Sequence, residues 1–203
     1  MKFQVSAKDK KTLCKQAPEF REVVRRIELD GFECNGDLFH ALVQSIISQQ
    51  LSIKAADTIY NRVEQLLGTI TAENLKSAAV EELRACGLSA RKIEYLRGIA
   101  DAVLSGRINF DALARLPDEE IMKELVKLKG VGEWTAEMLL IFALGRPDVL
   151  SFKDLGIRRG IMLLNKLEEL TEEDFEVYRK RYSPYGTLAS LYLWRIKDGG
   201  LSG

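Results

Sequence analysis

Apolar residues recur at every third or fourth position along most of the chain, which is the spacing that gathers them on one face of an α-helix. The apolar–polar alternation of a half-buried strand is missing, apart from one short candidate piece at Phe3 to Val5. The pattern therefore predicts an all-α fold.

Two helices are predicted early in the chain. Asp37 caps the first, which ends near Ser48, and the second begins at Ser52 and is stopped by Gly68. The residues predicted to face inward are Phe39, Leu42, Val43, Ile46 and Ile47 in the first helix, and Ala55, Ala56, Ile59, Tyr60, Val63, Leu66 and Leu67 in the second.

The same periodicity and similar cap signals predict six more helices. The first is capped by Ser89 and turns Ile93, Leu96, Ala100, Val103 and Leu104 inward, and Pro117 fits the first turn of the second. The others are expected over 133–144 with Gly145 as the stop, over 155–167, from Thr171 with Asp174 completing a capping-box variant, and from Pro184 onward. The tail 199–203 is expected to be mobile.

Length and composition are those of a globular chain that folds as one domain or two intimate lobes, since 203 residues include 46% hydrophobic and 30% charged positions. No apolar run reaches the roughly 18 residues of a membrane span, and the amino terminus lacks the apolar core of a signal peptide. A cytoplasmic protein with no membrane partner is expected.

Charge and cysteine content narrow the possible chemistry. Thirty basic and thirty acidic residues give no global attraction to a polyanion, so nucleic acid would have to bind a local patch. Cys14, Cys34 and Cys86 lack the paired spacing of a zinc site or an iron–sulfur cluster, so neither is expected, and the cysteines are predicted to be reduced structural thiols.

A tight turn at Leu128-Lys-Gly-Val-Gly132 separates two of the predicted helices. Gly130 and Gly132 permit unusual backbone conformations and leave the amides that open the next helix accessible to a phosphate, while Val131 can tuck between the helices. Lys127 and Lys129 would supply local positive charge. The alternative is a plain glycine helix stop followed by a new helix.

The turn belongs to a set of motifs with a known family order. Leu128-x-Gly-Val-Gly-x-Trp-Thr-Ala136 precedes Ser151-Phe-Lys-Asp-Leu-Gly-Ile-Arg-Arg-Gly160, and upstream lie a Gln49-Gln-Leu-Ser52 helix end and Gly87-Leu-Ser-Ala-Arg-Lys92. Together these segments resemble the helix-hairpin-helix DNA glycosylase superfamily, in particular its 3-methyladenine DNA glycosylase II branch. The resemblance implies one glycosylase unit over 1–203 with two helical lobes, residues 36–130 and residues 1–35 plus 131–203, and the active site in the cleft between them.

Asp154 matches the family's catalytic aspartate. Cleavage of an N-glycosidic bond builds positive charge on the sugar, which a fixed carboxylate can stabilise, and amides at a helix start favour the ionised form. The alternative is that Asp154 only caps the helix that begins at Leu155, and the two roles are compatible.

Trp134 stands where the resemblance places a Schiff-base lysine in bifunctional relatives, and neither Lys129 nor Lys153 aligns with that lysine. A monofunctional enzyme is therefore expected, with water as the nucleophile and an abasic site as the product. The indole face also suits a cationic alkylpurine. The alternative is a core indole.

The other site residues are carried over from the resemblance. The base pocket is expected to include Tyr185, Met138 and His40, although His40 also fits a structural role, and Gly186 and Ser151-Phe152 depart from the common arginine and proline of the family. Gln50 is the expected wedge that replaces a flipped base, with Leu51 as its apolar neighbour, against the alternative of a solvated helix end.

Two further expectations concern ions and phosphates. Arg158 and Arg159 contact phosphates or pair with carboxylates. In the superfamily, main-chain carbonyls of the hairpin hold a monovalent cation, which points to Val126, Leu128 and Val131 and to Na⁺ or K⁺. No cofactor is expected for the chemistry itself.

The sequence thus predicts a monomeric DNA N-glycosylase of base excision repair that acts on damaged double-stranded DNA, at the nucleoid or in the nucleus according to the source. Three alternatives stay open: another lesion (ethenoadenine, an oxidised purine or uracil), a non-catalytic DNA-binding protein with the same hairpin, and a purely structural helical protein.

Overall fold

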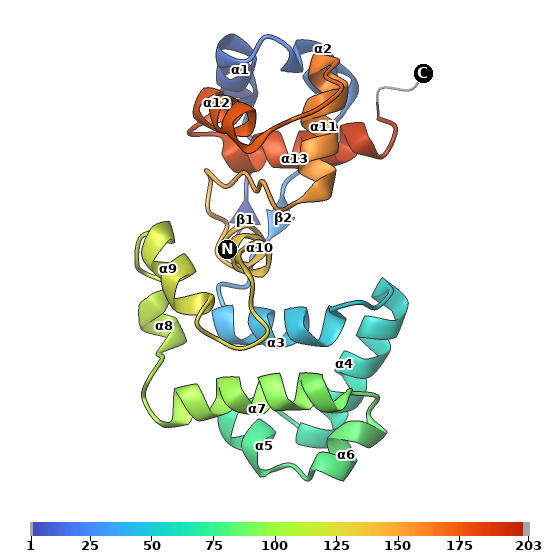
Figure 1. The fold of residues 1–203 in the computed structure, drawn as a ribbon, viewed down its shortest axis with the longest axis vertical. Coiled ribbons are helices and arrows are strands. Elements are labelled where there is room, and N and C mark those ends of the chain that lie inside the picture. The colour runs from blue at the N-terminus through green and yellow to red at the C-terminus, as the bar shows by residue number, and fades with distance from the viewer. Residues whose placement is uncertain (1, 201–203) are drawn as a thin grey trace. The chain divides into compact units, whose positions relative to one another are not determined.

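The computed structural model describes residues 2–200, which form thirteen helices and a two-stranded sheet (Figure 1). The predicted all-α fold is confirmed; of the tail predicted to be mobile, residues 201–203 lie outside the described part. The elements are β1 Lys2–Phe3, α1 Ala7–Gln16, α2 Phe20–Arg26, β2 Phe32–Glu33, α3 Leu38–Ser48, α4 Ile53–Leu67, α5 Ala72–Ser77, α6 Val80–Ala85, α7 Ala90–Leu104, α8 Phe110–Leu113, α9 Asp118–Leu125, α10 Glu133–Phe142, α11 Leu155–Asn165, α12 Glu172–Tyr182 and α13 Gly186–Lys197.

The predicted caps are confirmed by their hydrogen bonds. Asp37 accepts the His40 amide at 2.9 Å, and the hydroxyls of Ser52, Ser89 and Thr171 accept the amide three residues on in α4, α7 and α12. Each bond satisfies a donor that the first helical turn cannot pair internally.

Several predicted boundaries and faces were wrong. α10 ends at Phe142 rather than 144, α11 at Asn165 rather than 167, and α13 begins two residues after Pro184. Leu66 and Leu104, predicted to face inward, are exposed, because both lie in the last turn of a helix, where few neighbours cover them.

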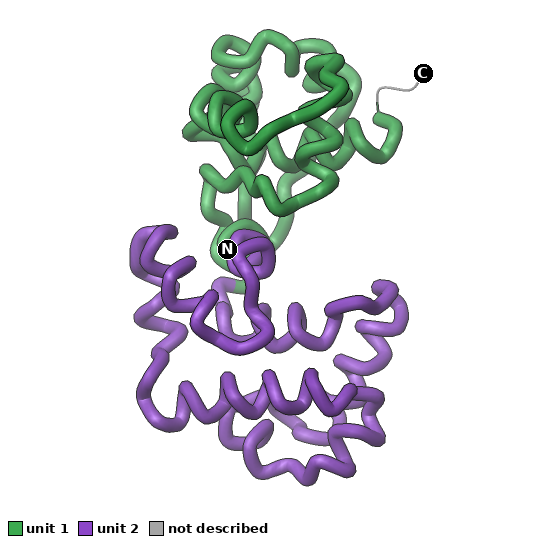
Figure 2. The backbone as a smooth tube through the Cα atoms, viewed as in Figure 1, with its two compact units in different colours: residues 1–35, 140–203 green, residues 36–139 purple. Residues whose placement is uncertain are grey.

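The chain divides into two compact units (Figure 2): unit 1 contains residues 1–35 and 140–203, and unit 2 contains residues 36–139. The second boundary between the units falls inside α10, between Leu139 and Leu140, whereas the lobe boundary was predicted at about 130/131.

Unit 1 has a core built from α1, α2, α11, α12 and α13. Phe20 packs edge-on against Tyr182 with ring centroids 5.0 Å apart, and both side chains are fully buried. The helices α11 and α13 lie in close contact, because a Cβ on Gly160 would stand only 2.5 Å from the Leu193 carbonyl oxygen. The pair of β1 and β2 joins Phe3 to Phe32 in antiparallel register.

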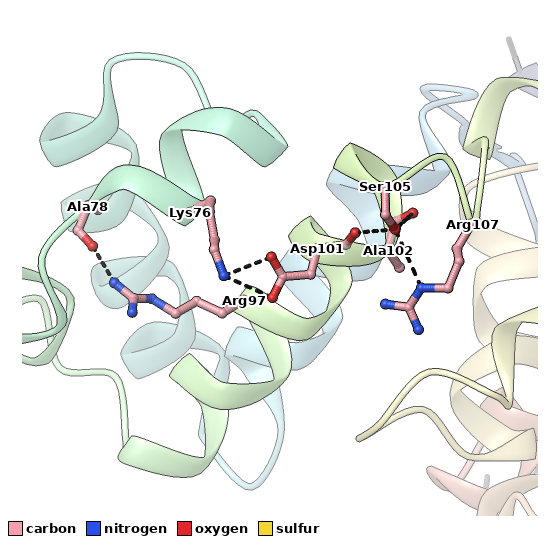
Figure 3. A network of polar contacts seen from close by, with 7 residues as sticks. All are labelled: Lys76, Ala78, Arg97, Asp101, Ala102, Ser105 and Arg107. Atoms are coloured by element: carbon pink, nitrogen blue, oxygen red, sulfur yellow. Dashed lines mark hydrogen bonds and ion pairs between the residues drawn. The ribbon is translucent and has the colours of Figure 1, made fainter.

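Unit 2 packs α3 against α4 and α7, and α5 against α7. A polar network ties α7 to the segments before it (Figure 3): Lys76 pairs with Asp101 at 2.7 Å, and an Arg97 guanidinium nitrogen donates to the Ala78 carbonyl at 2.5 Å. The Ser105 hydroxyl donates to the Asp101 carbonyl and closes the end of α7. The helix α7 that these contacts anchor also packs against α3.

All three cysteines are free thiols, as predicted. Cys34 and Cys86 are buried, and burial raises the pKa of the Cys14 and Cys86 thiols, which disfavours the reactive thiolate.

Candidate functional site

The turn between α3 and α4 holds its residues in an unusual conformation. Gln49 ends α3, and Gln50 follows with a φ of 58°, in the left-handed region that non-glycine residues rarely adopt. Leu51 is 38% exposed beside it. The Gln49 side-chain amide donates to the Gly130 carbonyl at 2.9 Å, so the turn is tied to the Gly-Val-Gly segment 81 residues later.

The two glycines of that segment differ in what requires them. Gly130 has a φ of 90°, and a Cβ there would lie 2.3 Å from the Tyr95 ring, so both backbone and packing demand glycine. Gly132 has ordinary backbone and open space where a Cβ would stand, and its carbonyl accepts the Ala136 amide at 3.0 Å at the start of α10. Val131, the residue between the two glycines, is buried, in agreement with the prediction that its side chain tucks inward.

A hollow of about 630 Å³ opens beside this turn within unit 2. Its lining consists of Ser45, Ser48, Gln49, Gln50, Leu51, Ser89, Arg91, Lys92, Tyr95, Gly130, Trp134 and Thr135. Trp134 is 45% exposed and lines this hollow, so it is not a core indole. The hollow brings together four residues that were predicted for the base pocket and the DNA contacts: Gln50, Leu51, Gly130 and Trp134.

Most polar residues of the hollow were not predicted as site residues, among them Gln49, Arg91 and Lys92. Gln49 links the two turns, the Lys92 ammonium donates to the Ile47 carbonyl at 2.7 Å, and Arg91 lies over the Tyr95 ring at 5.5 Å and donates to its hydroxyl. Burial lowers the pKa of Lys92. Arg91 and Lys92 belong to the Gly87 to Lys92 motif, and Gln49 belongs to the Gln49 to Ser52 motif. The local sequence did not indicate which side chains of these motifs line the hollow.

The positive charge predicted at the hairpin is paired. Lys129 forms an ion pair with Glu94, which raises the pKa of the lysine, and Lys127 pairs with Glu124 at 2.6 Å. Both pairs are exposed, so they are weak and can be exchanged for a phosphate.

Asp154 lies in unit 1 as the N-cap of α11. One carboxylate oxygen, Oδ1, accepts the Ile157 amide at 2.8 Å and the Trp194 indole N–H at 3.0 Å. The residue is only 8% exposed, and its carboxylate is held both by the first turn of α11 and by a side chain of α13. Trp194, predicted to serve packing on the last helix, therefore also contacts the expected catalytic group.

The remaining predicted base-pocket residues belong to both units, Tyr185 to unit 1 and Met138 and His40 to unit 2. Tyr185 is half-buried against the core of unit 1, at the residue before α13. Met138 is half-buried in α10 and does not line the hollow at Trp134. His40 lines a second hollow of unit 2 with Phe39 and receives a 2.7 Å contact from the Asp37 carboxylate, so the structural interpretation of this histidine fits its surroundings.

The two arginines after Asp154 have different environments. The Arg158 guanidinium lies over the Phe152 ring at 4.8 Å, a cation–π contact that neither prediction for this residue included. Arg159 is exposed and lines a hollow of unit 1 with Lys166 and Lys197.

The carbonyls predicted to hold a cation lie around the end of α9. Val126 follows its last residue, where carbonyls have no partner in a following turn, and the Leu128 carbonyl accepts the Val131 amide at 3.1 Å while keeping a second lone pair. In the described residues no cluster of three histidine, cysteine or acidic side chains suits a metal, and no helix there is long and apolar enough to cross a membrane.

The sequence profile of the HhH-GPD superfamily, described as base excision DNA repair protein, matches residues 43–184 of the 203. The chain belongs to the HhH-GPD superfamily.

Three relatives are similar to the chain over more than two thirds of their length. DNA-3-methyladenine glycosylase 1 of Schizosaccharomyces pombe is 39% identical over 162 residues, 77% of this chain and 71% of that protein. The crystal structure of a DNA-3-methyladenine glycosidase from Bacillus halodurans superposes with a TM-score of 0.83 at 38% identity, covering 97% and 92% of the two chains. The structure of the S. pombe 3-methyladenine DNA glycosylase in complex with abasic DNA superposes with a TM-score of 0.78 at 34% identity, covering 95% of this chain and 97% of that one.

The HhH-GPD match contains the α3–α4 turn, the hairpin and Asp154, and it ends before Tyr185 and Trp194. The helix α13, which contacts Asp154, thus lies outside the matched region.

Proposed function

We propose that this chain is a monofunctional DNA N-glycosylase that hydrolytically releases alkylated purines such as 3-methyladenine from duplex DNA and leaves an abasic site. The names of its relatives support the substrate class. The observation that carries the chemistry is the Asp154 carboxylate, held by two donors at the start of α11, in a chain whose hairpin helix carries an indole at position 134.

Asp154 acts on the sugar. As the C1′–N bond breaks, its electrons leave with the base, and the sugar acquires oxocarbenium character that the carboxylate stabilises. Water then adds its hydroxide to C1′ and releases a proton. An N-alkylated purine already carries positive charge, so it departs neutral and needs no protonation by the enzyme.

Trp134 excludes the other route and favours the substrate. An indole cannot form a Schiff base with C1′, so strand cleavage through a lysine is not available at this position. With 45% of its surface exposed, the ring offers its electron-rich face to a cationic base, an attraction worth about 0.5–2 kcal/mol.

DNA is held by the turns of unit 2 in this proposal. Gln50 enters the duplex in place of the flipped base, with Leu51 against the neighbouring bases. The open backbone at Gly132 and the amides of α10 receive a phosphate, assisted by Lys129 after it leaves Glu94. Arg159 is a further phosphate ligand, and Arg158 contributes through the Phe152 segment that it covers.

The hairpin carbonyls of Val126, Leu128 and Val131 fit a monovalent cation, because hard oxygen donors at a helix end suit Na⁺ or K⁺. Such an ion would add positive charge beside the phosphate site. The reaction itself uses no cofactor in this proposal.

The test is a panel of duplex oligonucleotides that carry 3-methyladenine (or its stable analogue), 7-methylguanine, ethenoadenine, 8-oxoguanine or uracil. Base release is read by mass spectrometry, and strand breaks are read separately with and without alkali. Release of alkylpurines with breaks only after alkali is expected.

Each other outcome of the panel decides against part of the proposal. Release confined to another lesion would change the substrate, binding without release of any base would favour the non-catalytic alternative, and a borohydride-trapped crosslink to the wild-type protein would overturn the monofunctional mechanism.

A further inference from the structure

Trp194 joins the last helix to the start of α11. Its indole N–H donates to Asp154 Oδ1 at 3.0 Å, and the same oxygen accepts the Ile157 amide at 2.8 Å. The first bond spans 40 residues of sequence, whereas the second is the local cap of the helix. Asp154 is therefore fixed both by its own helix and by α13.

The indole is itself held by a column of aromatic rings, which we call the aromatic column: Phe3, Phe32, Phe142 and Trp194. Phe142 stacks on Trp194 with centroids 5.7 Å apart and planes 21° apart. Phe32 lies 5.2 Å from Phe142, and Phe3 stacks on Phe32 at 5.0 Å. Since the column covers the indole face, rotation of the ring away from Asp154 would break its stacking on Phe142.

Two glycines of α11 make room for this arrangement. A Cβ on Gly160 would lie 2.5 Å from the Leu193 carbonyl oxygen, and a Cβ on Gly156 would lie 2.9 Å from the indole Cδ1 and 3.0 Å from Asp154 Oδ1. The two positions are one helical turn apart on the face toward α13. Neither needs an unusual φ, so the lack of a side chain serves the close approach of Trp194 to the carboxylate.

We propose that Trp194 is the positioning residue of the Asp154 carboxylate, a role that rests on the proposed glycosylase function. The helix cap ties Oδ1 to α11 through a single hydrogen bond, around which the carboxylate torsion stays soft. A second donor, from another helix to the same oxygen, restrains the position of that oxygen further. Because a misplacement of about 1 Å can cost roughly 100-fold in rate, the second donor sets the efficiency of bond cleavage.

The decisive variant is Trp194→Phe, which keeps an aromatic ring on Phe142 and removes only the N–H donor and one ring. We expect the single-turnover rate of 3-methyladenine release to fall about 10- to 100-fold, with the Kd for abasic-site DNA within about two-fold of wild type. A merely structural role would lower the melting temperature and leave the single-turnover rate per folded protein unchanged.

Tyr192→Phe is the matched control. Tyr192 lies on the same helix, is fully buried, and has a hydroxyl without a hydrogen-bond partner among the described residues. Its loss removes one O–H donor from an aromatic ring and is expected to leave excision unchanged. Gly156→Ala perturbs the contact itself, because its methyl group would press on both the indole and Asp154 Oδ1; it is expected to lower the rate at least as much as Trp194→Phe.

A spectroscopic measurement tests the contact without activity. The chain has two tryptophans, so ¹⁵N-indole labelling gives two side-chain N–H resonances, and Trp194→Phe assigns them. In Asp154→Asn the Trp194 resonance is expected to move upfield, because its acceptor loses charge, while the Trp134 resonance stays in place.

The outcomes separate the two proposals. Unchanged excision by folded Trp194→Phe, or an unmoved Trp194 resonance in Asp154→Asn, would overturn the positioning role. Absence of excision by wild type, together with the expected resonance shift, would instead overturn the proposed glycosylase function and leave the Trp194–Asp154 contact standing.

Discussion

At the scale of single residues, the hairpin glycines have different reasons to lack a side chain. Gly130 is required by the fold itself, because its φ is 90° and a Cβ at this position would lie 2.3 Å from the Tyr95 ring. No packing contact within the described chain requires glycine at position 132, because a Cβ there would meet open space. The second glycine is thus explained by what approaches from outside.

Alanine at each glycine should separate stability from DNA binding. Gly130→Ala is expected to destabilise the fold by about 1–3 kcal/mol, through backbone strain and the clash with Tyr95. Gly132→Ala is expected to leave the melting temperature unchanged, yet to weaken binding to abasic-site DNA several-fold, because its methyl group fills the phosphate approach. Thermal unfolding and fluorescence anisotropy measure the two effects; equal DNA affinity of Gly132→Ala and wild type would contradict the phosphate role.

Asp154→Asn should remove chemistry while sparing the fold. Asparagine is as good a helix cap as aspartate but carries no charge, so excision is expected to fall by at least about 10²–10³-fold with DNA affinity retained. Asp174→Asn, at the amino end of α12, is the control and is expected to excise normally. Measurable wild-type rates in Asp154→Asn would assign the catalytic role elsewhere.

At the scale of elements, the turn from α3 to α4 combines strain with exposure. Gln50 and Lys166 are the non-glycine residues with positive φ in the described chain, at 58° and 57°. Lys166 ends α11 in a common left-handed cap, whereas Gln50 lies between two helices beside the hollow at Trp134. Strain that persists at such a place is typical of a functional turn.

Replacement of Gln50 by glycine should relieve the backbone strain at this turn and lower excision activity. Gln50→Gly is expected to keep or raise the melting temperature, since relief of about 1 kcal/mol offsets the added freedom of the unfolded chain. Excision from duplex DNA is expected to fall at least ten-fold, because the wedge is lost. Lys166→Gly relieves the same backbone strain and should excise like wild type; a similar loss in both variants would argue against a wedge at Gln50.

The starts of helices were predictable from the sequence where a side chain caps the first turn. Asp37, Ser52, Ser89 and Thr171 all accept the expected amides. Five helices, α1, α2, α5, α6 and α8, were not predicted. The last three have four to six residues, too few to show a helical period, and α1 buries only Leu13, so it shows no apolar face.

At the scale of the whole molecule, zero net charge means that DNA affinity comes from local contacts. Each phosphate contact contributes a slope of about −0.9 to the dependence of log affinity on log salt, so a four-fold rise in salt weakens binding about 3.5-fold per contact. Pairing of Lys129 with Glu94 lowers the charge available before DNA arrives.

A lysine comparison tests this account. Lys129→Gln is expected to reduce the magnitude of the salt slope by about one and to weaken binding to damaged and undamaged duplexes alike. Lys76, exposed and paired with Asp101 in the same unit, is the control, and Lys76→Gln should leave the slope unchanged. Titrations by anisotropy between 50 and 400 mM salt give both slopes, and identical slopes for the two variants would remove Lys129 from the phosphate contacts.

The sequence by itself determined the helical class, the main caps, the Gly-Val-Gly turn and the family motifs, because each depends on residues within one or two helical turns of one another. Only the tertiary structure decided that Trp194 donates to Asp154, that Gln49 bonds Gly130 and that Phe3 stacks on Phe32, since these contacts join segments 29 to 81 residues apart. No local pattern encodes such pairs; they exist because packing of the helices brings the side chains within reach.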